Sequence, residues 1–493
     1  MKNTFFIFLL SFITSQTRAQ SYLWAYSAGY TPTNQVSSLK RDHIGDLYII
    51  TNEDSAGQIL NTRLEKRNTS NTILWNLELP GGAYITDVEI NSQNHPVIVG
   101  CFKGDLITST DTLSSHAMFS AFLIETFEDG TIFWTVNFNP ANDDFMPVDL
   151  FIDNNDNIYL TAEMAGATSH GFSSFHKLDQ WGIPMHDEFN DDIEVRTFSH
   201  ILADNSGNIY LSGTCGPSAT FDSLQSSSEQ YQNFLVKYDA NFNAQWIICR
   251  EYITFDHNNG LGSDGQSLYW SFIEATQFSD TIRFMKTDYN GQIQIERTGP
   301  LLTTFFPSIT MGTDSGGNNI FISNIYNNIF LFRYDNQFNL LWEDTLLANV
   351  SGFPSQIRIA CYDSSFYIGS RYYADSLFLD AHLLINPNIS VIDADIFVAK
   401  WGYPEVVSVP SINGNAAISY FPNPANEKIN FYYPGNYSAI LTLIDYQGKI
   451  CYTENISSKK YHEIDLTSVS SGLYLMQISG KDFSFGNKIL VQH

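Results

Sequence analysis

Basic side chains are scarce in this sequence. Its 493 residues include 25 Lys and Arg against 52 Asp and Glu, which gives a formal net charge of −27 at pH 7. A protein that binds nucleic acid needs a basic face to displace the counterions of the phosphates, so no nucleic acid is expected as a partner. The charge balance also disfavours binding to an anionic membrane surface.

Cysteine is scarce as well. The cysteines lie far apart, without the close spacings that zinc sites use: Cys101, Cys215, Cys249, Cys361 and Cys451. We expect them to be small core residues rather than a disulfide framework.

Long apolar runs are also absent, so no transmembrane segment is predicted. The run FFIFLLSFI follows Lys2 and has the length of the apolar region of a signal peptide. Thr17 and Ala19 fit the small-residue pattern that precedes a cleavage point. Residues 1–19 are therefore predicted to be a signal peptide, cleaved between Ala19 and Gln20, with the general export machinery as its partner.

What the sequence has in quantity is apolar surface. Hydrophobic residues make up 43% of the chain and aromatic residues 15%, which is ample for a large packed core. The length suggests two or three folded units. The excess of acidic residues lies upstream of Ala416, because the segment from there to the end holds six acidic and six basic residues.

Two sequence patterns alternate through the acidic part of the chain. In one, an apolar-x-Lys-x-Asp segment and a turn lead to an aromatic residue, as in FLVKYDANFNAQW, which ends at Trp246. The other reads Asp-x-x-Gly-Asn-Ile-Tyr-Leu, with its best copies around Tyr159 and Tyr210. Each has the alternation of strands broken by an Asp, Asn or Gly turn, so each predicts a hairpin. Together they predict a four-stranded antiparallel sheet.

The ends of this repeat complement each other. The Tyr pattern occurs seven times, Trp24 has no Lys strand before it, and Lys400 has no Trp strand after it. We therefore predict an all-β fold in which residues 20–403 form a seven-bladed β-propeller closed by the N-terminal strand. Closure would leave only short, protected sheet edges.

These repeats resemble those of bacterial seven-bladed propeller families, whose blades carry an Ala-Phe-Val-Ala-Lys-Tyr-Asp-like strand and an Asp-x-x-Gly-Asn-Val-Tyr-like hairpin. The resemblance covers most of residues 20–403. It implies an architecture and leaves the function open, because propellers host many unrelated activities.

The last part of the chain has a different character. Residues 404–415 are rich in Pro, Gly and small polar residues and predict a linker. Residues 416–493 hold four blocks of alternating apolar residues separated by turns, which predict a small antiparallel β-sandwich.

The four blocks resemble the C-terminal sorting domain of proteins exported by the type IX secretion system of Bacteroidota. The matching residues are Pro422, Asn423, Pro424, Asp445, Gly448, Gly472, Leu473, Tyr474 and Lys488. The resemblance implies passage across the outer membrane to the cell surface or the medium. It also implies a type IX translocon and a sortase-like peptidase as partners, with the mature protein either released or attached to lipopolysaccharide.

Residues that recur in every blade cannot all belong to one asymmetric site. The recurring basic residues are expected to point outward from a strand, and the recurring aspartates to bond the backbone of turns: Lys66, Lys177, Lys237, Lys286, Arg333, Lys400, Asp153 and Asp204. Glu125 replaces the repeated Lys, whereas His186 and Ile295 replace the repeated Trp. Decay of the repeat is the expected reason for these replacements.

One acidic cluster suggests a cation site. Asp143 and Asp144 follow the outer strand of one blade, and Asp191 and Asp192 follow that of the next. Equivalent loops of adjacent blades emerge on one face, so the four carboxylates could hold calcium; the alternative is a solvated acidic rim. No other cofactor is predicted.

No catalytic residue is predicted, since no nucleophile elbow, phosphate loop or dinucleotide fingerprint is present. The sequence therefore favours an exported, non-enzymatic binding or structural module, with an unidentified glycan or protein as its surface ligand. The alternative is a secreted polysaccharide-active hydrolase or lyase with its site at the propeller axis. An enzyme requires at least two convergent titratable groups with separated pKa values.

Overall fold

The computed structural model describes residues 21–493 except for short gaps, at 29–32, 56–57, 80, 140–143, 166–170, 191–193, 227, 229, 252–258, 276–279, 303–307, 326–327, 347–356, 363–364, 373–374, 380–381, 387–394, 403–419, 422–424, 434–436, 446–448, 459 and 481–483. The chain separates into two compact units, Met1–Tyr403 and Pro404–His493. The predicted signal peptide and linker lie outside the described residues.

The described part of the first unit is all-β and contains sheets of four antiparallel strands, which we number in chain order. Sheet 1 contains β2 (Thr33–Arg41), β3 (Leu47–Ser55), β4 (Gln58–Arg67) and β5 (Ile73–Leu79), and sheet 2 contains β6 (Ala83–Ile90), β7 (Pro96–Phe102), β10 (Ser120–Thr126) and β11 (Ile132–Phe138). Sheet 3 contains β12 (Asp144–Ile152), β13 (Ile158–Ala165), β14 (Gly171–Leu178) and β15 (Pro184–Asn190), and sheet 4 contains β16 (Val195–Ala203), β17 (Ile209–Cys215), β20 (Gln232–Tyr238) and β21 (Ala244–Glu251). Sheet 5 contains β22 (Asn259–Ser263), β23 (Leu268–Ala275), β24 (Asp280–Thr287) and β25 (Ile293–Leu302). Sheet 6 contains β26 (Ser308–Thr313), β27 (Asn319–Ile325), β28 (Asn328–Tyr334) and β29 (Leu340–Leu346). Sheet 7 contains β30 (Arg358–Tyr362), β31 (Ser365–Tyr372), β34 (Asp395–Gly402) and β1 (Ser21–Ala28).

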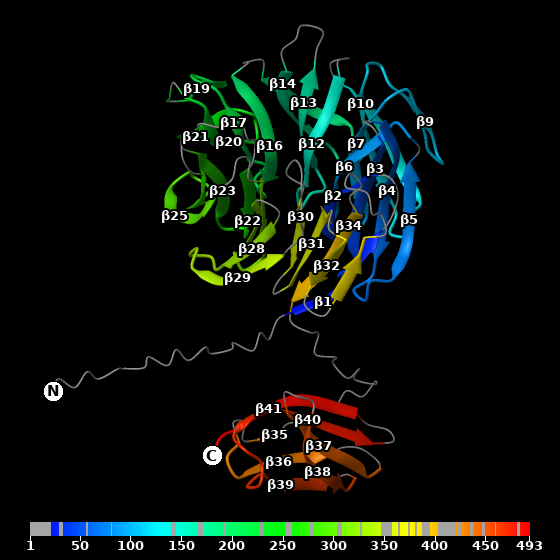
Figure 1. Cartoon of the computed structure of the whole chain (residues 1–493), viewed down its shortest axis with the longest axis vertical. Coiled ribbons are helices and arrows are strands. Elements are labelled where there is room, and N and C mark those ends of the chain that lie inside the picture. The colour runs from blue at the N-terminus through cyan, green and yellow to red at the C-terminus, as the bar shows by residue number, and fades with distance from the viewer. Residues whose placement is uncertain are drawn as a thin grey trace, which may run out of the picture. The chain divides into compact units, whose positions relative to one another are not determined.

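The sheets have a propeller-like arrangement. The first strand of each sheet packs against the first strand of the next, and β30 packs against β2. In Figure 1 the chain runs from the blue sheets through cyan and green to the yellow strands, which lie beside the blue ones. Three two-stranded hairpins extend sheets 2, 4 and 7 between their second and third strands: β8 (Asp105–Ile107) with β9 (Thr112–Ser114), β18 (Thr220–Phe221) with β19 (Leu224–Gln225), and β32 (Ser376–Leu379) with β33 (His382–Ile385).

Burial explains why the middle strands have continuous apolar sequences. Every residue of β7 and β17 is buried, because neighbouring sheets cover both of their faces. The outer strand β5 instead alternates toward solvent. Cys101 and Cys215 lie buried in β7 and β17, as predicted for small core residues. Cys249 and Cys361 are half-buried, and the prediction was wrong for Cys451, which is exposed in the second unit.

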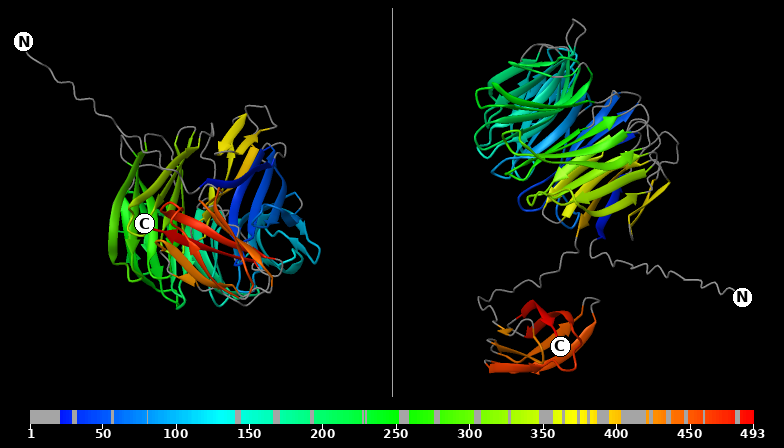
Figure 2. Two further views of the ribbon diagram at one scale, coloured as in Figure 1. Left: turned by 90° about the horizontal axis from the view of Figure 1, so that it is seen from below. Right: turned by 90° about the vertical axis from the view of Figure 1, so that its left-hand side faces the viewer.

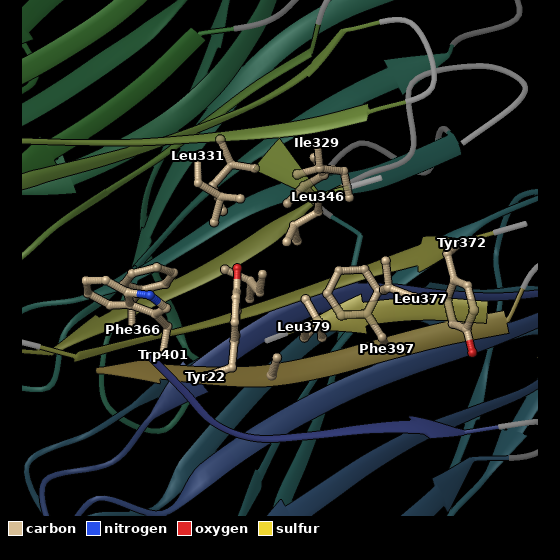
Figure 3. Packing of buried hydrophobic residues seen from close by; sticks show 14 of the residues in the cluster. Tyr22, Ile329, Leu331, Leu346, Phe366, Tyr372, Leu377, Leu379, Phe397 and Trp401 are labelled. Carbon is tan, nitrogen blue, oxygen red and sulfur yellow. The ribbon is translucent and has the colours of Figure 1, made fainter. Parts of the chain in front are cut away.

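Sheet 7 is assembled from both ends of the first unit. Strand β1 pairs antiparallel with β34, from Ser21 opposite Gly402 to Ala28 opposite Ile396. Tyr22 of β1 is buried in the same core cluster as Phe366 and Trp401, which Figure 3 shows from close by. The cluster also includes Leu331 of sheet 6, so the N-terminal strand contributes to the packing between sheets.

The repeated aspartates build the turns, as predicted. Asp204 Oδ1 accepts hydrogen bonds from Ser206 N at 2.8 Å and Asn208 N at 3.0 Å, while its Oδ2 accepts from Tyr210 Oη at 2.9 Å. Asp153 does the same with its own turn and with Tyr159. These carboxylates are therefore occupied by the backbone of their own hairpins.

The prediction that the repeated lysines point outward was wrong. Lys66 is 1% exposed, and its Nζ lies 3.1 Å from Asp42 Oδ2 and 5.1 Å from the ring centre of Tyr48. The same ammonium-over-tyrosine contact recurs in four other sheets, at Lys177, Lys237, Lys286 and Lys400. The repeated Lys and Tyr face each other across paired strands, so each ammonium lies over a ring; Lys66, Lys286 and Lys400 are buried, whereas Lys177 and Lys237 are half-buried.

Adjacent sheets also meet through a large-and-small pair. Trp75 of sheet 1 donates from Nε1 to Glu128 O at 2.7 Å, and a Cβ added at Gly130 in that turn would lie 2.7 Å from the Trp75 ring. Gly182 faces Trp134 and Gly291 faces Trp246 in the same way. Each Gly also has a positive φ, so it meets both a steric and a backbone requirement.

The two sheets that lack this Trp show the reverse arrangement. His186 replaces Trp, and Phe242 occupies the positive-φ turn position of the next sheet, with the two rings stacked at 3.6 Å. Ile295 packs in the same cluster as Phe338, which also has a positive φ. Each small residue is thus matched by a large one, and these deviations are compensated packing.

The second unit forms two sheets around a core of its own. One contains β35 (Tyr420–Phe421), β36 (Lys428–Tyr433) and β39 (Lys460–Asp465); the other contains β38 (Ile450–Ile456), β37 (Ala439–Ile444), β40 (Gly472–Gly480) and β41 (Ser484–Val491). Phe431 from the first sheet and Leu441 and Met476 from the second share one buried cluster. Figure 2 shows these strands in orange to red.

Candidate functional site

A cavity of about 590 Å³ lies where the first strands of sheets 1 to 7 converge. Each of these seven strands contributes to its lining, which makes it the common centre of the first unit. Its volume falls within the roughly 300–1,000 Å³ of typical ligand sites. We call it the axial cavity.

One strand position of the axial cavity differs from sheet to sheet. It lies two residues before the residue that pairs with the repeated Tyr position of the second strand, and its occupants in order are Ser38, Asp87, Asp149, His200, Gly260, Thr310 and Arg358. The turn residues themselves are nearly uniform, as aspartates recur there. A symmetric scaffold therefore carries an asymmetric set of ionisable groups on its axis.

Two aspartates of this set connect neighbouring sheets. Asp87 accepts from Ser38 Oγ at 2.6 Å, from Val88 N at 2.8 Å and from Leu150 N at 3.1 Å. Asp149 Oδ2 accepts from Ile201 N at 2.8 Å. Each carboxylate is held in place by the first strand of the following sheet, so its orientation is fixed before any ligand arrives.

Basic groups lie beside these carboxylates. His200 Nδ1 is 3.7 Å from Asp149 Oδ2, and its Nε2 donates to Asn259 O at 2.9 Å. Lys40 forms an ion pair with Glu89, and Arg358 Nε donates to Ser37 O. The acidic and basic side chains therefore occupy one continuous arc formed by β30, β2, β6, β12 and β16.

Burial and crowding shift the protonation of this arc. Burial, together with the carboxylates of Asp149 and Glu89, raises the pKa of Asp87 to about 7. Burial alone would lower the pKa of His200, but the Asp149 carboxylate outweighs it and leaves that pKa raised. Burial also raises the pKa of Glu89, against the opposing effect of Lys40. Asp87 therefore retains a proton up to about pH 7, and the charged form of His200 is favoured relative to a free imidazole.

The opposite arc of the axial cavity is mostly apolar. Strands β22 and β26 contribute Leu261, Ile309 and Met311 to its lining. Gly260 lies at the shared strand position, and a Cβ added there would stand 2.6 Å from Met311 Cβ. This glycine lets β26 approach β22, which leaves the cavity polar on one side and apolar on the other.

A second cavity of about 470 Å³ opens beside the first turns of sheets 3, 4 and 5. Phe151 and Leu202 line both cavities, so the two adjoin. Its other lining residues include Asn154, Asn205 and Tyr289. We call it the turn groove.

The predicted calcium cluster is only partly described. Asp143, Asp191 and Asp192 lie outside the described residues. Asp144 lies at the start of β12, and its Oδ1 accepts from Phe119 N at 2.9 Å. No three His, Cys, Asp or Glu side chains are grouped as a metal site requires within the part of the chain that the structure describes. The cluster stays a prediction.

A serine, a histidine and an aspartate line up in sheet 3, where sequence reasoning did not expect them. His176 Nδ1 is 2.8 Å from Asp187 Oδ1, and its Nε2 is 2.8 Å from Ser174 Oγ. Ser174 and His176 are fully buried, and the rings of Phe138, Phe145 and Phe189 pack around the imidazole. Since the hydroxyl has no access to a substrate, this group is a core hydrogen-bond network.

Glu125, the exception among the repeated lysines, also has a local partner. It is buried in β10, accepts from His95 Nδ1 at 2.7 Å and from Asn91 Nδ2 at 3.1 Å, and pairs with Val97 where five of the other sheets have Tyr. The exchange of Lys for Glu thus accompanies the loss of the tyrosine and the arrival of a histidine.

The predicted sorting residues occupy turns and strands of the second unit. Asp445 closes a turn with Lys449 through two bonds of 2.9 Å. Gly472, Leu473 and Tyr474 begin β40, where Tyr474 is buried and donates to Ser470 O at 2.9 Å. Lys488 is exposed on β41, whereas Pro422, Asn423, Pro424 and Gly448 lie outside the described residues.

A family model described as a secretion system C-terminal sorting domain matches residues 419–492. The C-terminal residues form a type IX sorting domain. This sorting domain marks the chain for secretion by the type IX system to the cell surface or beyond, and it implies contact with that machinery. No helix with the length and hydrophobicity of a membrane span occurs among the described residues.

Comparisons of the whole chain give only remote likenesses. A polysaccharide lyase, Uly1, is 13% identical over 80% of this chain and 94% of its own, with a TM-score of 0.43. A sialidase from Trypanosoma rangeli is 8% identical over 94% of this chain and 87% of its own, with a TM-score of 0.40. A protein of unknown function from Bacteroides caccae is 9% identical over 57% of this chain and 89% of its own, with a TM-score of 0.32. No curated protein matches the chain.

Proposed function

We propose that the first unit is a closed ring of seven blades and that it binds a ligand in the axial cavity outside the outer membrane. Three contacts support closure. Strand β1 pairs with β34, β30 packs against β2, and Trp24 Nε1 donates to Thr69 O at 3.1 Å. The last contact repeats, from sheet 7 to sheet 1, the bond that Trp75 makes from sheet 1 to sheet 2.

The export route is part of the same proposal. An N-terminal signal peptide directs the chain across the inner membrane of a member of the Bacteroidota. The sorting domain then directs it through the type IX translocon, where a sortase-like peptidase removes that domain. The strongly acidic propeller would act at the cell surface or in the medium.

The binding role is carried by the axial residues that differ between sheets. The repeated Asp, Lys and Tyr side chains are occupied in turns and buried pairs, and the exchanged Trp positions are compensated by their neighbours. Asp87, Asp149, His200 and Arg358 instead converge on one cavity. This is how a repeated scaffold acquires a single asymmetric binding site.

A second candidate is the hydrolysis or lysis of a polysaccharide at the same place. One observation favours it: Asp87 holds a proton to about pH 7 beside the carboxylates of Asp149 and Glu89. A protonated and an ionised carboxyl in one site are the general acid and base of such chemistry.

The test uses residues 20–493, which keep the sorting domain, on a panel of polysaccharides and glycoproteins, with and without calcium. Retention and the release of new chain ends are read together. Asp149→Asn keeps the acceptor for Ile201 and is expected to reduce retention, whereas Glu343→Gln on the outer strand β29 leaves it unchanged. Retention without product supports the binding role, and new chain ends support the enzyme. Retention that ignores Asp149→Asn would overturn the axial assignment.

A further inference from the structure

Building on the axial binding role proposed above, we infer that the ligand is an uncharged oligosaccharide whose end unit occupies the axial cavity and whose next units lie in the turn groove. The inference rests on the adjacency of two cavities, on the chemistry of their linings and on an aromatic face in the second.

The two adjoining cavities determine the shape of the ligand that would fit them. The two cavities of about 590 and 470 Å³ share Phe151 and Leu202 as lining residues. Each volume is within the range of a complete ligand site. A single small molecule would leave one of them unused, whereas a chain of several units occupies both.

The lining of the turn groove offers hydrogen-bonding groups, and its two carboxylates already accept hydrogen bonds from the protein. Asn154 Nδ2 donates to Asn205 Oδ1 at 2.6 Å, and Ser206 and Ser263 add hydroxyl groups to the lining. Asp153 and Asp204 also line it, but their carboxylates accept from backbone amides and from Tyr159 or Tyr210. Amides and hydroxyls that pair with one another are matched to the hydroxyls of a neutral sugar.

The axial cavity likewise carries little net charge. Its lining has three basic side chains, Lys40, His200 and Arg358, and four acidic ones, Asp87, Glu89, Asp149 and Glu163. This balance contrasts with the net charge of −27 for the whole chain. A polyanion approaching this protein would be repelled over its surface and would meet more acidic than basic side chains in the axial cavity.

An aromatic face is held ready in the turn groove. Tyr289 packs on Tyr210 with ring centres 5.3 Å apart, and its hydroxyl lies 2.7 Å from Ser263 Oγ. Both contacts fix the ring while leaving it partly exposed. The apolar CH face of a sugar ring can pack on such a surface while its hydroxyls reach the amides.

The experiment is isothermal titration calorimetry of residues 20–493, which keep the sorting domain, with neutral gluco-, manno-, xylo- and galacto-oligosaccharides of one to six units, and with oligouronides of the same lengths. For one neutral series, affinity is expected to rise about tenfold between one and three units and then level off. The oligouronides are expected to bind more weakly at every length.

Two tyrosine variants report on the turn groove. Tyr289→Ala is expected to reduce the affinity for longer chains to that of the single sugar, while Tyr289→Phe retains the ring and the affinity. Tyr461→Ala, at an exposed position of the sorting domain, is the matched control. Thermal melting of each variant separates a binding loss from a folding loss.

The outcomes distinguish this inference from the binding role beneath it. If Asp149→Asn weakens binding but affinity ignores chain length, or the tightest ligand is an oligouronide, the axial role stands and the extended neutral glycan is refuted. If Tyr289→Ala weakens single sugars and long chains equally, the turn groove is not a subsite. If Asp149→Asn changes no affinity, the axial role itself fails.

Discussion

At the scale of single residues, repetition separates scaffold from site. Asp204 and Lys66 belong to patterns that recur from sheet to sheet, and both are occupied, by a turn and by a buried ion pair. Asp87 and His200 share one strand position, yet their chemistry differs. The protonation of Asp87 and the ion pair that compensates the buried charge of Lys66 are therefore the properties to test at this scale.

Asp87→Asn should alter how stability depends on pH. The folded pKa of Asp87 is raised from its ordinary value of 3.8 to about 7. Between these values the native chain holds a proton that the unfolded chain has lost, so this carboxyl contributes stability that falls as pH rises. The free energy of unfolding of the wild type, relative to the variant, is expected to decrease from pH 4 to pH 7. Urea titrations at several pH values measure it, and a constant difference would contradict the assignment.

Lys66→Met should be strongly destabilising. The ammonium lies against Asp42, whose side chain is completely buried, and its removal leaves that carboxylate without its ion-pair partner. The expected cost is about 3 kcal/mol in the free energy of unfolding. Lys428→Met is the matched control, because both side chains of the Lys428–Glu463 pair are more than half exposed and such pairs contribute less than about 1 kcal/mol. Chemical denaturation compares the two, and equal losses would refute the prediction.

At the scale of the elements, the contact between neighbouring sheets has two interchangeable forms. Trp75 with Gly130 is one, and His186 with Phe242 is the other. Both fill the same space with one large and one smaller group. The pair, rather than either residue, is the unit that the fold requires.

This exchange predicts a rescue. Gly130→Phe should destabilise the propeller by more than about 2 kcal/mol, because its side chain would overlap the Trp75 ring and its φ is positive. Adding Trp75→His should recover much of that loss, since it recreates the second form. A double-mutant cycle by thermal unfolding measures the coupling. Additive effects of the two substitutions would show that the pairs are not equivalent.

Much of this element-level structure could be predicted, because strand and turn patterns are local. The hairpins around Tyr159 and Tyr210 follow from alternation and from the Asp turn. The direction of Lys66 could not be predicted in this way, because alternation identifies two faces of a strand but not which neighbouring sheet covers each. The axial position was detectable, since Asp87, Asp149 and His200 stand at a fixed spacing before a turn, but only the converging strands reveal that they share a cavity.

At the scale of the whole molecule, two units have separate cores and separate tasks. The core that includes Tyr22 and Trp401 draws on both ends of the first unit, whereas the core of the sorting domain draws only on its own strands. Damage to the N-terminal strand should therefore be confined to the first unit.

Deletion of β1, residues 21–28, tests this separation. Losing the buried side chain of Tyr22 alone removes roughly 1.5–3 kcal/mol of hydrophobic stabilisation, and the pairing with β34 is lost with it. Differential scanning calorimetry should show a lower transition temperature for the propeller and an unchanged one for the sorting domain. A synthetic peptide with the sequence of β1 should restore part of the loss. Unchanged melting of the propeller would contradict the role of this strand.

The pairing of β1 with β34 also has a kinetic consequence. Residues at the start of the first unit find their partners only near its end, so this ladder has the greatest sequence separation in the unit, and contacts of that kind form slowly. Until they form, the edge of β34 is an open template for another strand. The chain therefore carries an exposed strand edge that favours aggregation until β1 and β34 pair, and residues 21–28 are the segment that covers it.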